Sequence, residues 1–269
     1  MKEWHIALPM YGVTPTAHAN QRRLLEHLTD VLHTGGWKET IRIVDPPVPL
    51  VTHWLDPRLL LSQTCGYPLM TTLRGRVALL ATPRYDCEGC AGGAASSRFV
   101  VRDNAAGDTL ADFRGRVAAV NSMDSNSGMN VFRHALAPLA GSEPFFSRVA
   151  LSGGHRRSVD MVRAGDADIA AIDAVTWRLL AQDDGGSVAG LRTLGFSTRA
   201  PALPLIGSAL LSDTQRATVR VALDTLAQRE STLLKALRID GFQAANWADY
   251  ERILDIEREA SGHGANVFP

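Results

Sequence analysis

This sequence has few cysteines, no excess of charge of either sign and no long apolar run. Its 269 residues contain 28 basic and 28 acidic side chains, so nothing in the composition favours nucleic acid as a partner. No segment approaches the roughly 18 consecutive apolar residues that a membrane-spanning helix needs. The opening stretch, Met-Lys-Glu-Trp-His-Ile-Ala-Leu-Pro, lacks the apolar region of a secretory leader. The chain as printed is therefore expected in the cytoplasm, and a chain whose leader has been removed is expected in the periplasm.

The three cysteines are Cys65, Cys87 and Cys90, and the last two belong to a Cys-Glu-Gly-Cys sequence. A structural zinc site needs four ligands, and no second cysteine pair or nearby His-x3-His completes one, so we expect no metal and no cofactor. A redox Cys-x-x-Cys motif opens a helix, whereas this one lies between Tyr85-Asp86 and an Ala-Gly-Gly-Ala-Ala run. The favoured interpretation is free or disulfide-linked thiols in a loop.

Motifs of the common catalytic and nucleotide sites are missing as well. There is no Gly-x-Ser-x-Gly elbow, no His-Glu-x-x-His and no carboxylate pair matched to a base. The Gly-x4-Gly-Lys-Ser/Thr loop of nucleotide-binding proteins is absent too. These absences favour a protein that binds a ligand without converting it.

Short β-like runs alternate with helical patterns along the chain, which is typical of an α/β protein with parallel sheets covered by helices on both faces. Residues 15–33 form a long helical pattern with an apolar stripe that includes Leu24 and Leu28, and Gly35-Gly36 ends it. The strands expected in this first part are residues 6–10, 41–44, 59–63, 77–81 and 99–101.

A second series of elements predicts a compact βαβαβ unit. Its strands are expected at residues 117–121, 148–151 and 168–172. The first of its helices carries Phe132, Ala135 and Leu136 on one face, and the second, residues 156–164, ends at Gly165. The segments that follow are extended at residues 191–196 and 205–211 and helical from residue 213 to 229 and beyond, and we expect the tail to return to the first lobe.

Two segments, near residues 82–102 and 191–204, are the expected crossings between two lobes. Lobe 1 is then discontinuous, with residues 1–90 and 200–269, and lobe 2 is residues 91–199. A chain that leaves one lobe, builds the other and returns forms a two-stranded hinge. Ligands of such proteins bind in the cleft between the lobes, at the carboxyl ends of strands.

Residues 120–130, Val-Asn-Ser-Met-Asp-Ser-Asn-Ser-Gly-Met-Asn, form a polar loop between a strand and an amphipathic helix. The first amides of that helix and the hydroxyls of Ser125 and Ser127 would point at one spot, where the helix dipole favours an anion. The sequence therefore predicts an oxyanion site here. Ordinary N-capping by either serine is the alternative.

Two further candidates follow other strands of the same lobe. His155, in Ser-Gly-Gly-His-Arg-Arg-Ser, would donate to an anion, or it is an exposed or capping histidine. Asp173 follows the apolar run Ala-Asp-Ile-Ala-Ala-Ile and would accept the proton of a monoprotonated phosphate or phosphonate, or pair with an amino group on the ligand. The alternative for Asp173 is an N-cap of the segment that begins at Ala174.

The first lobe supplies aromatic and polar side chains in the same positions. Tyr11 and Tyr85 each follow a strand, and the stretch from residue 62 to 68, Ser-Gln-Thr-Cys-Gly-Tyr-Pro, places Gln63, Thr64 and Tyr67 after another. Aromatic side chains at a cleft rim act as amphipathic lids, and packing is the alternative for each one alone. The convergence of five strand ends on one cleft favours ligand contact.

These stretches together resemble the phosphonate, phosphite and phosphate substrate-binding proteins of ABC transporters. The segments that carry the resemblance are Leu-Leu-Leu-Ser-Gln-Thr-Cys-Gly-Tyr-Pro-Leu (59–69), Ala-Thr-Pro-Arg-Tyr (81–85), Asn-Ser-Met-Asp-Ser-Asn-Ser-Gly-Met-Asn (121–130), Ser-Gly-Gly-His-Arg-Arg-Ser (152–158) and Ala-Ala-Ile-Asp-Ala-Val-Thr-Trp (170–177). Their order and spacing match over roughly residues 5 to 210. The resemblance implies a type II periplasmic-binding-protein fold with two α/β lobes that close over the ligand.

The resemblance also implies roles for individual residues. The oxyanion would be held by Ser125, Asn126, Ser127 and Gly128 together with His155. Tyr11, Tyr67 and Tyr85 would line the organic side of the ligand, and Asp173 would occupy the position that can meet a ligand amine. Relatives imply a disulfide between Cys65 and Cys90. The implied partners are a small oxyanion and the membrane permease of an ABC transporter, and we expect a monomer.

Two other interpretations stay open at this point. One is an enzyme on the same fold, such as a cofactor-biosynthesis protein, because fold alone does not settle function. The other is a cytoplasmic sensor, which the missing leader favours and the absence of a fused helix-turn-helix or kinase segment disfavours. Turnover of the ligand would identify the enzyme, and an apolar leader encoded upstream in frame would support export.

Overall fold

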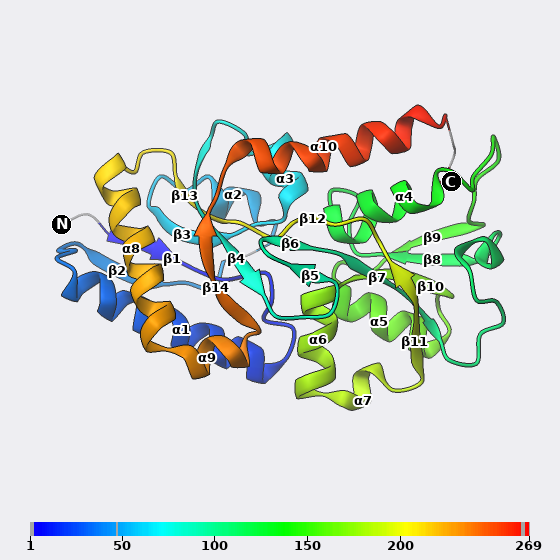
Figure 1. The fold of residues 1–269 in the computed structure, drawn as a ribbon, viewed down its shortest axis with the longest axis horizontal. Helices are drawn as coiled ribbons and strands as arrows, with labels where there is room; N and C mark the ends of the chain where they lie inside the picture. The colour runs from blue at the N-terminus through cyan, green and yellow to red at the C-terminus, as the bar shows by residue number, and fades with distance from the viewer. Residues whose placement is uncertain (1–2, 47, 265–266, 269) are drawn as a thin grey trace. The chain divides into compact units, whose positions relative to one another are not determined.

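The computed structural model describes residues 3–46, 48–264 and 267–268. The chain divides into two compact units (Figure 1). Unit 1 contains Met1–Asp86, Ala91–Gly93 and Pro201–Asp249, and unit 2 contains Cys87–Cys90, Ala94–Ala200 and Tyr250–Pro269.

The sheet of unit 1 has six strands in the order β14-β4-β13-β3-β1-β2. They are β1 (Glu3–Ile6), β2 (Thr40–Ile43), β3 (Leu59–Gln63), β4 (Val77–Tyr85), β13 (Leu205–Ser208) and β14 (Ile239–Ala244). β1 is parallel to β2 and β3, whereas β13 is antiparallel to β3 and β4, and β14 is antiparallel to β4. The sheet is mixed and not mostly parallel as expected, because two strands from the later part of the chain pair into it.

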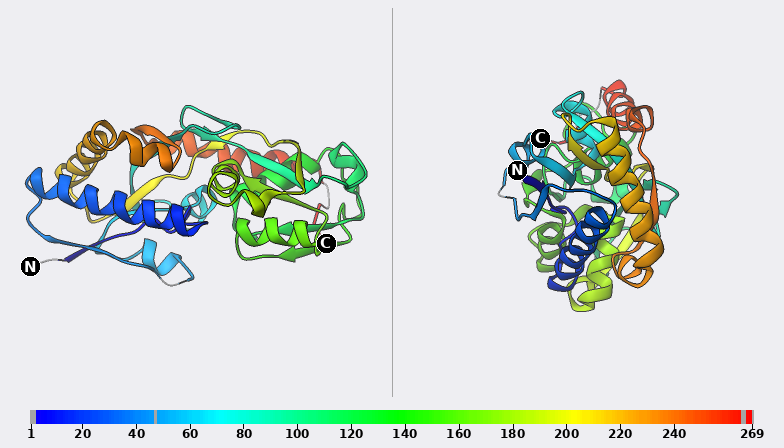
Figure 2. Two further views of the ribbon diagram at one scale, coloured as in Figure 1. Left: turned by 90° about the horizontal axis from the view of Figure 1, so that it is seen from below. Right: turned by 90° about the vertical axis from the view of Figure 1, so that its left-hand side faces the viewer.

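The helices of unit 1 are α1 (Pro15–Thr34), α2 (Val51–Trp54), α3 (Gly66–Thr71), α8 (Asp213–Arg229) and α9 (Ser231–Ala236). α1 begins where the Thr14 hydroxyl accepts a hydrogen bond from the Ala17 amide at 3.0 Å, beside a proline at its first position. Its stripe, with Leu24 and Leu28, is buried as the 3.6-residue period predicts. Figures 1 and 2 show α1 in blue beside α8 and α9 in orange.

The sheet of unit 2 has five strands in the order β11-β7-β10-β8-β9. They are β7 (Ser97–Arg102), β8 (Val117–Val120), β9 (Arg148–Leu151), β10 (Ile169–Asp173) and β11 (Leu191–Phe196). β8 is parallel to both β9 and β10, which confirms the predicted βαβαβ unit. β7 is antiparallel to β10 and β11, so this sheet is mixed too.

The helical segments of unit 2 are a 3-10 turn (Leu110–Phe113), a π-helical turn (Asn126–Asn130), α4 (Val131–Leu136), α5 (His155–Ala164), α6 (Ala174–Asp183), α7 (Gly185–Val188) and most of α10 (Trp247–Gly262). α5 ends at Gly165, as predicted, because this glycine adopts the left-handed conformation with φ +87°. Phe132 of α4 stacks on Phe99 of β7 with 5.5 Å between ring centroids. α4 is thereby fixed to the sheet.

The chain passes between the units inside both segments that the sequence indicated. β5 (Cys90–Ala91), β6 (Ala94–Ala95) and β12 (Ala200–Pro201) lie at these crossings and form a three-stranded sheet in the order β12-β6-β5. A further crossing lies between Asp249 and Tyr250.

The expectation that the whole tail returns to lobe 1 is wrong for residues 250–269, which belong to unit 2. The physical reason is the apolar face of α10. Tyr250, Ile253 and Ile256 on this face are fully buried. The Ile253 carbonyl also accepts a hydrogen bond from Asn130 Nδ2 at 3.0 Å, which attaches α10 to the π-helical turn of unit 2.

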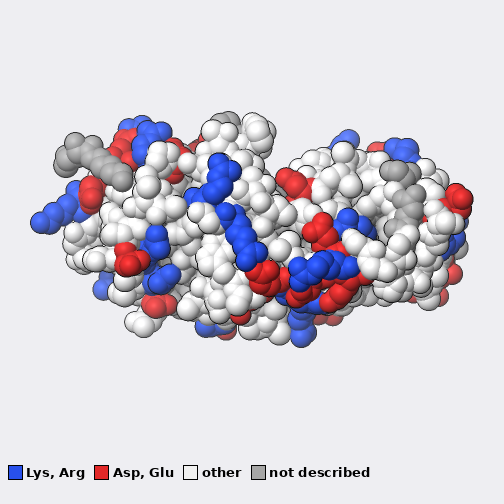
Figure 3. All heavy atoms as spheres, turned by 90° about the horizontal axis from the view of Figure 1, so that it is seen from above, with Lys and Arg blue, Asp and Glu red and all other residues white. Residues whose placement is uncertain are grey.

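The surface carries both signs of charge. Figure 3 shows basic and acidic side chains interspersed on the face that it presents, in agreement with 28 basic and 28 acidic residues. On α10, for example, Arg252 pairs with Glu259 and Arg258 with Asp255. Among the residues that the structure describes, no helix combines the length and apolar character needed to cross a bilayer.

Candidate ligand-binding site

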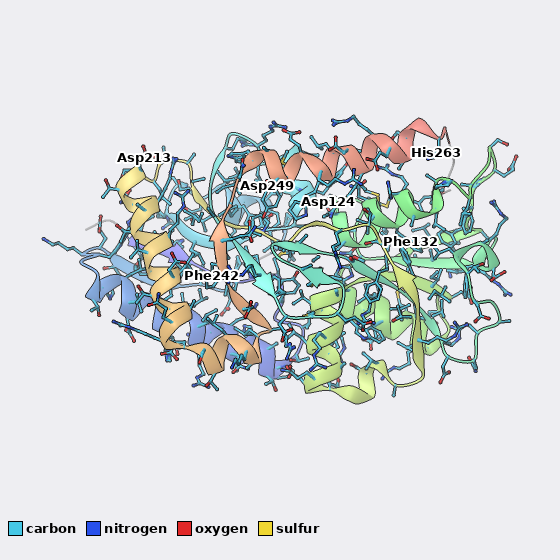
Figure 4. All side chains as sticks on the ribbon, in the orientation of Figure 1. Asp124, Phe132, Asp213, Phe242, Asp249 and His263 are labelled. Atoms are coloured by element: carbon cyan, nitrogen blue, oxygen red, sulfur yellow. The ribbon has the colours of Figure 1, made fainter. Side chains whose placement is uncertain are left out.

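The polar loop predicted to bind an anion ends in a π-helical turn at Asn126–Asn130, and α4 continues from it. The Asn130 amide donates to the carbonyl of Ser125 at 3.0 Å, a bond that spans five residues and so widens the turn. π-helical turns of this kind occur frequently at functional sites. In Figure 4 the labels on Asp124 and Phe132 locate this part of unit 2.

Ser125 is the N-cap of this turn, which was the structural alternative for this residue. Its hydroxyl accepts a hydrogen bond from the Gly128 amide at 3.0 Å, and only 4% of the residue is exposed. Gly128 is needed because of close packing: a Cβ there would lie 1.7 Å from Asn121 Oδ1. The Gly128 backbone and the Asn121 side chain therefore meet without room for any side chain at position 128.

Ser127 and His155 are brought together by the fold. Ser127 Oγ lies 2.8 Å from His155 Nε2, so the hydroxyl and the ring share one hydrogen bond. His155 is the first residue of α5 and follows β9, which ends at Leu151, after a three-residue connection, close to the strand end as predicted. Two predicted site residues that are 28 positions apart in sequence thus form one polar pair in unit 2.

The environment of His155 keeps its ring uncharged. Burial lowers the pKa of His155 to about 4, and interaction with the backbone of Ala171 acts in the opposite direction. Nδ1 is buried and makes no hydrogen bond of good geometry with the residues that the structure describes. The ring is therefore neutral at pH 7, with a single N–H to donate.

Asp173 caps α6, again the structural alternative for this residue. Its Oδ1 accepts hydrogen bonds from the amides of Val175 and Thr176, each at 2.9 Å, and the residue is 3% exposed. Asp173 pairs with Ser97 across β10 and β7. Asp173 is thus held firmly in unit 2, and its role as a ligand contact stays a prediction.

Three of the predicted residues of the first lobe also come together, in unit 1. Gln63 Nε2 donates to the hydroxyl of Tyr85 at 2.9 Å and to the carbonyl of Leu203 at 3.1 Å. The ring of Tyr85 meets that of Tyr11 edge to face, with 5.4 Å between centroids. Tyr11 and Tyr85 are 4% and 7% exposed, so packing occupies most of their surface.

Thr64 and Tyr67 lie near this group along the chain. Thr64 is fully buried, and its hydroxyl donates to the Cys65 carbonyl at 3.2 Å. Tyr67 is half-buried in α3. Both residues stay predicted ligand contacts.

The sequence did not indicate Ser97, and it did not single out the side chains of Asn121 and Asn130 within the predicted loop. Ser97 Oγ donates to the Ser127 carbonyl at 2.7 Å and so fixes the residue that contacts His155. The buried Oδ1 of Asn121 receives no hydrogen bond from the described residues. Asn121 does end the strand pattern at residues 117–121, and this position was a signal that could have identified it.

The predicted disulfide between Cys65 and Cys90 is wrong, because none of the three cysteines is in a disulfide in the described residues. Cys65 is buried in unit 1, immediately before α3. Cys90 belongs to unit 2, where its thiol is hydrogen-bonded to that of Cys87. Among the described residues there is no group of three or more His, Cys, Asp or Glu that would hold a metal ion.

Comparison with known proteins assigns the chain to a family. Residues 59–250 match the family described as ABC transporter, phosphonate, periplasmic substrate-binding protein. The chain belongs to this family. The matched segment contains the turn of Ser125–Gly128, His155 and Asp173. No curated protein is similar enough in sequence to be matched.

Solved structures show that this phosphonate-binding family member has the predicted two-lobed periplasmic-binding-protein fold. PhnD1 from Prochlorococcus marinus (MIT 9301), solved with methylphosphonate, has a TM-score of 0.78 and 14% identity, and the match covers 97% of this chain and 98% of PhnD1. The binding protein component of an ABC phosphonate transporter (PA3383) from Pseudomonas aeruginosa has a TM-score of 0.77 and 16% identity, with 97% and 87% covered. XAC2383 from Xanthomonas citri, bound to chloride, has a TM-score of 0.72 and 13% identity, with 98% and 99% covered.

Proposed function

We propose that this chain binds a small phosphorus oxyanion, such as a phosphonate, phosphite or phosphate, and delivers it to the membrane permease of an ABC transporter. The observation that carries the proposal is the 2.8 Å pair of Ser127 Oγ and His155 Nε2 at the first turn of a helix. An oxyanion there meets a hydroxyl, an imidazole N–H and backbone amides at once. Family membership supports the same assignment.

The energetics of this turn favour an anion. The dipole at a helix N-terminus contributes about 0.3 to 1 kcal/mol and up to about 2 kcal/mol where the anion is partly buried. Each hydrogen bond to a charged group adds roughly 1.5 to 3 kcal/mol. Four such bonds would offset an association cost of about 4 to 15 kcal/mol only if the donors are already in place. The hydrogen bonds of Ser125 and Ser97 to this turn hold its donors in place before the ligand binds.

Ligand binding would exchange one hydrogen bond for two. Ser127 and His155 bond to each other in this structure, and an oxyanion between them would accept a hydrogen bond from each. Because the ring is neutral, His155 donates only in the tautomer with hydrogen on Nε2. We therefore propose that the ligand selects this tautomer.

The tyrosines of unit 1 form a second part of the proposal. We expect Tyr11, Tyr67 and Tyr85, with Gln63 and Thr64, to contact the organic substituent. PhnD1, which has the same fold, was solved with methylphosphonate, so a small substituent is the first to examine. A ligand amine would pair with Asp173.

The experiment that tests the function is isothermal titration of the dialysed protein with phosphate, phosphite, methylphosphonate, 2-aminoethylphosphonate and sulfate. We expect tight binding of one phosphorus ligand. If the Asp173 carboxylate accepts a hydrogen bond from a protonated oxygen or an amine of the ligand, phosphate binds better than sulfate, because sulfate carries no proton near neutral pH. Equal affinity for phosphate and sulfate would remove that role from Asp173, and no binding of any phosphorus ligand would refute the proposed function.

Ser127→Ala is the variant that tests the oxyanion turn. Loss of one charge-assisted hydrogen bond should cost roughly 1 to 3 kcal/mol, an affinity about 5-fold to 150-fold weaker, with little change in folding. Ser147→Ala is the matched control, because Ser147 is an exposed serine of the same unit. Its affinity should equal that of the unaltered protein. Unchanged affinity of Ser127→Ala would exclude this turn as the binding site.

A second candidate function, catalysis, is favoured by the same Ser127–His155 pair, because a hydroxyl hydrogen-bonded to an imidazole is the usual start of a nucleophilic mechanism. Phosphorus NMR of each bound ligand after prolonged incubation separates the two functions. Quantitative recovery of unchanged ligand supports transport, and a new phosphorus species would establish an enzyme. Residence in the periplasm is proposed from the family, and an apolar leader encoded upstream in frame would support it.

A further inference from the structure

The segment Cys87-Glu88-Gly89-Cys90 forms a tight turn that brings two thiols together. The Cys90 amide donates to the Cys87 carbonyl at 2.9 Å, and the two thiols are hydrogen-bonded to each other. Both cysteines are half-buried and both are reduced. Cys65 is buried in the other unit and takes no part in this pair.

The surroundings hold this turn in one shape. Gly89 adopts φ +96°, and a Cβ at this position would lie 2.8 Å from the Phe196 ring and 3.3 Å from the Ala174 Cβ. The Gly89 carbonyl accepts a hydrogen bond from the Ser96 amide at 3.0 Å. The turn is thus packed against the start of α6 and against β11, so its two sulfurs are already close before any bond forms between them.

We propose that Cys87 and Cys90 are the site of an intramolecular disulfide that forms in an oxidising compartment. The oxidant is a disulfide, either a small molecule such as glutathione disulfide or a protein thiol oxidase. The Cys87 thiolate attacks one sulfur of the oxidant and releases a first thiolate. The Cys90 thiol then loses its proton and attacks the Cys87 sulfur of the mixed disulfide. This step forms the Cys87–Cys90 bond and releases the second thiolate of the oxidant. Two protein thiols are oxidised and one disulfide is reduced to two thiols.

The local chemistry points to a durable bond and not to a catalytic redox centre. The hydrogen bond with Cys87, burial and the nearby Asp173 carboxylate all raise the pKa of the Cys90 thiol. Catalytic Cys-x-x-Cys thiols have lowered pKa values and open a helix, whereas Cys90 begins β5. The disulfide would close a ring at the crossing of the chain, since residues 87–90 stand between two stretches of unit 1.

Trypsin gives a direct assay, because cleavage after arginine isolates the pair. Peptide 85–98 contains Cys87 and Cys90 and no other cysteine, and peptide 59–74 contains Cys65 alone. The reduced full-length protein is equilibrated in glutathione buffers of increasing disulfide content, and its remaining thiols are then blocked with N-ethylmaleimide in denaturant. The protein is digested with trypsin, and the peptide masses are measured by mass spectrometry. We expect peptide 85–98 to lose two hydrogens and take up no maleimide, while peptide 59–74 takes up one.

Comparison with the unfolded chain tests whether the turn is responsible. Half-oxidation of the folded protein should need roughly tenfold less glutathione disulfide than half-oxidation of the same chain in urea, because the fold holds the sulfurs together. Cys65→Ser is the control and should behave like the unaltered protein, and Cys87→Ser should abolish the effect. Equal half-points in the folded and unfolded chains would overturn the proposal. So would glutathione attached to either cysteine in place of the internal bond. Neither readout uses ligand, so this result is independent of the proposed transport function.

Discussion

At the scale of single residues, the side chains proposed to bind the ligand have structural roles at the same time. Ser125 and Asp173 cap helices, and Gln63 bonds to Tyr85 within unit 1. A capped or paired donor is fixed in direction, and fixed donors lose less entropy when a ligand arrives. The structural and functional interpretations of these residues are therefore compatible.

His155 gives a pH-dependent stability that can be measured without ligand. Its pKa is about 4 in the folded chain and near the ordinary 6.5 when unfolded, so the unfolded state gains a proton first as the pH falls. The free energy of unfolding should be unaffected by His155 above pH 6.5, fall between pH 6.5 and 4, and lose no more below that. At about 1.36 kcal/mol for each pKa unit, the loss is about 3 kcal/mol at most.

Urea unfolding of the unaltered protein and of His155→Gln, in phosphate-free buffers from pH 4 to 8, checks this prediction. Glutamine keeps a donor and an acceptor for Ser127 but does not titrate. Burial also lowers the pKa of His53, but His53 is present in both proteins, so its effect cancels in the difference. If both proteins show the same slope between pH 6.5 and 4, burial does not control the charge of His155.

The sequence located those residues that lie at or shortly after the end of a strand. Asp173 is the last residue of β10 and His155 lies shortly after β9, and both were found because parallel strands end at the same edge of a sheet. Ser97 was missed because it lies at the start of an antiparallel strand, and its proximity to Ser127 depends on how β7 pairs with β10. Long-range pairing of this kind leaves no periodic signal in the sequence.

At the scale of elements, helices with a regular apolar stripe and a clear start were predicted closely. A helix was expected from residue 213 to 229 and beyond, and α8 spans Asp213–Arg229, where Ser212 and Gln215 form a capping box. β1 was expected at residues 6–10 but ends at Ile6. Its pattern alternates, with buried Trp4 and Ile6 between more exposed residues, and the proline at position 9 cannot donate to a ladder.

The π-helical turn depends on an element far away in sequence. Asn130 is fully buried, and its Nδ2 donates to Asn126 Oδ1 and to the Ile253 carbonyl of α10, each at 3.0 Å. Asn130→Leu would leave both acceptors buried without this donor. We expect a loss of unfolding free energy of about 1 to 3 kcal/mol in total, because two hydrogen bonds of roughly 0.5 to 1.5 kcal/mol each are removed.

Urea unfolding midpoints of Asn130→Leu and of Asn104→Leu give the comparison. Asn104 is exposed in the same unit, and its replacement should change the free energy by less than about 0.5 kcal/mol. Equal stability of the two variants would mean that the bond between the turn and α10 contributes nothing to folding.

At the scale of the whole molecule, the assignment of the last 20 residues was beyond sequence reasoning. The apolar face of α10 is visible in the pattern of Tyr250, Ile253 and Ile256, which shows that the helix packs on something. Which unit it packs on depends on partners far away in sequence, such as Asn130 of the π-helical turn, which donates to the Ile253 carbonyl. A helical period gives no information about the partner.

The division into units predicts which amides exchange faster after a mutation in the core. Ile256 of α10 and Leu28 of α1 are buried with 0% and 2% exposure and belong to different units. Truncation of either to alanine should cost about 2 to 5 kcal/mol, because a buried aliphatic side chain is replaced by a cavity. Local opening then exposes the amides of the unit that carries the cavity.

Hydrogen exchange with peptide resolution shows which unit that is. Ile256→Ala should speed exchange in β8 and β10 and leave β1 and β3 near their original rates, and Leu28→Ala should do the reverse. Each variant thus serves as the control for the other, since both remove the same volume from a buried aliphatic side chain. Faster exchange in β1 and β3 upon Ile256→Ala would mean that α10 stabilises unit 1, which is where the sequence alone had placed it.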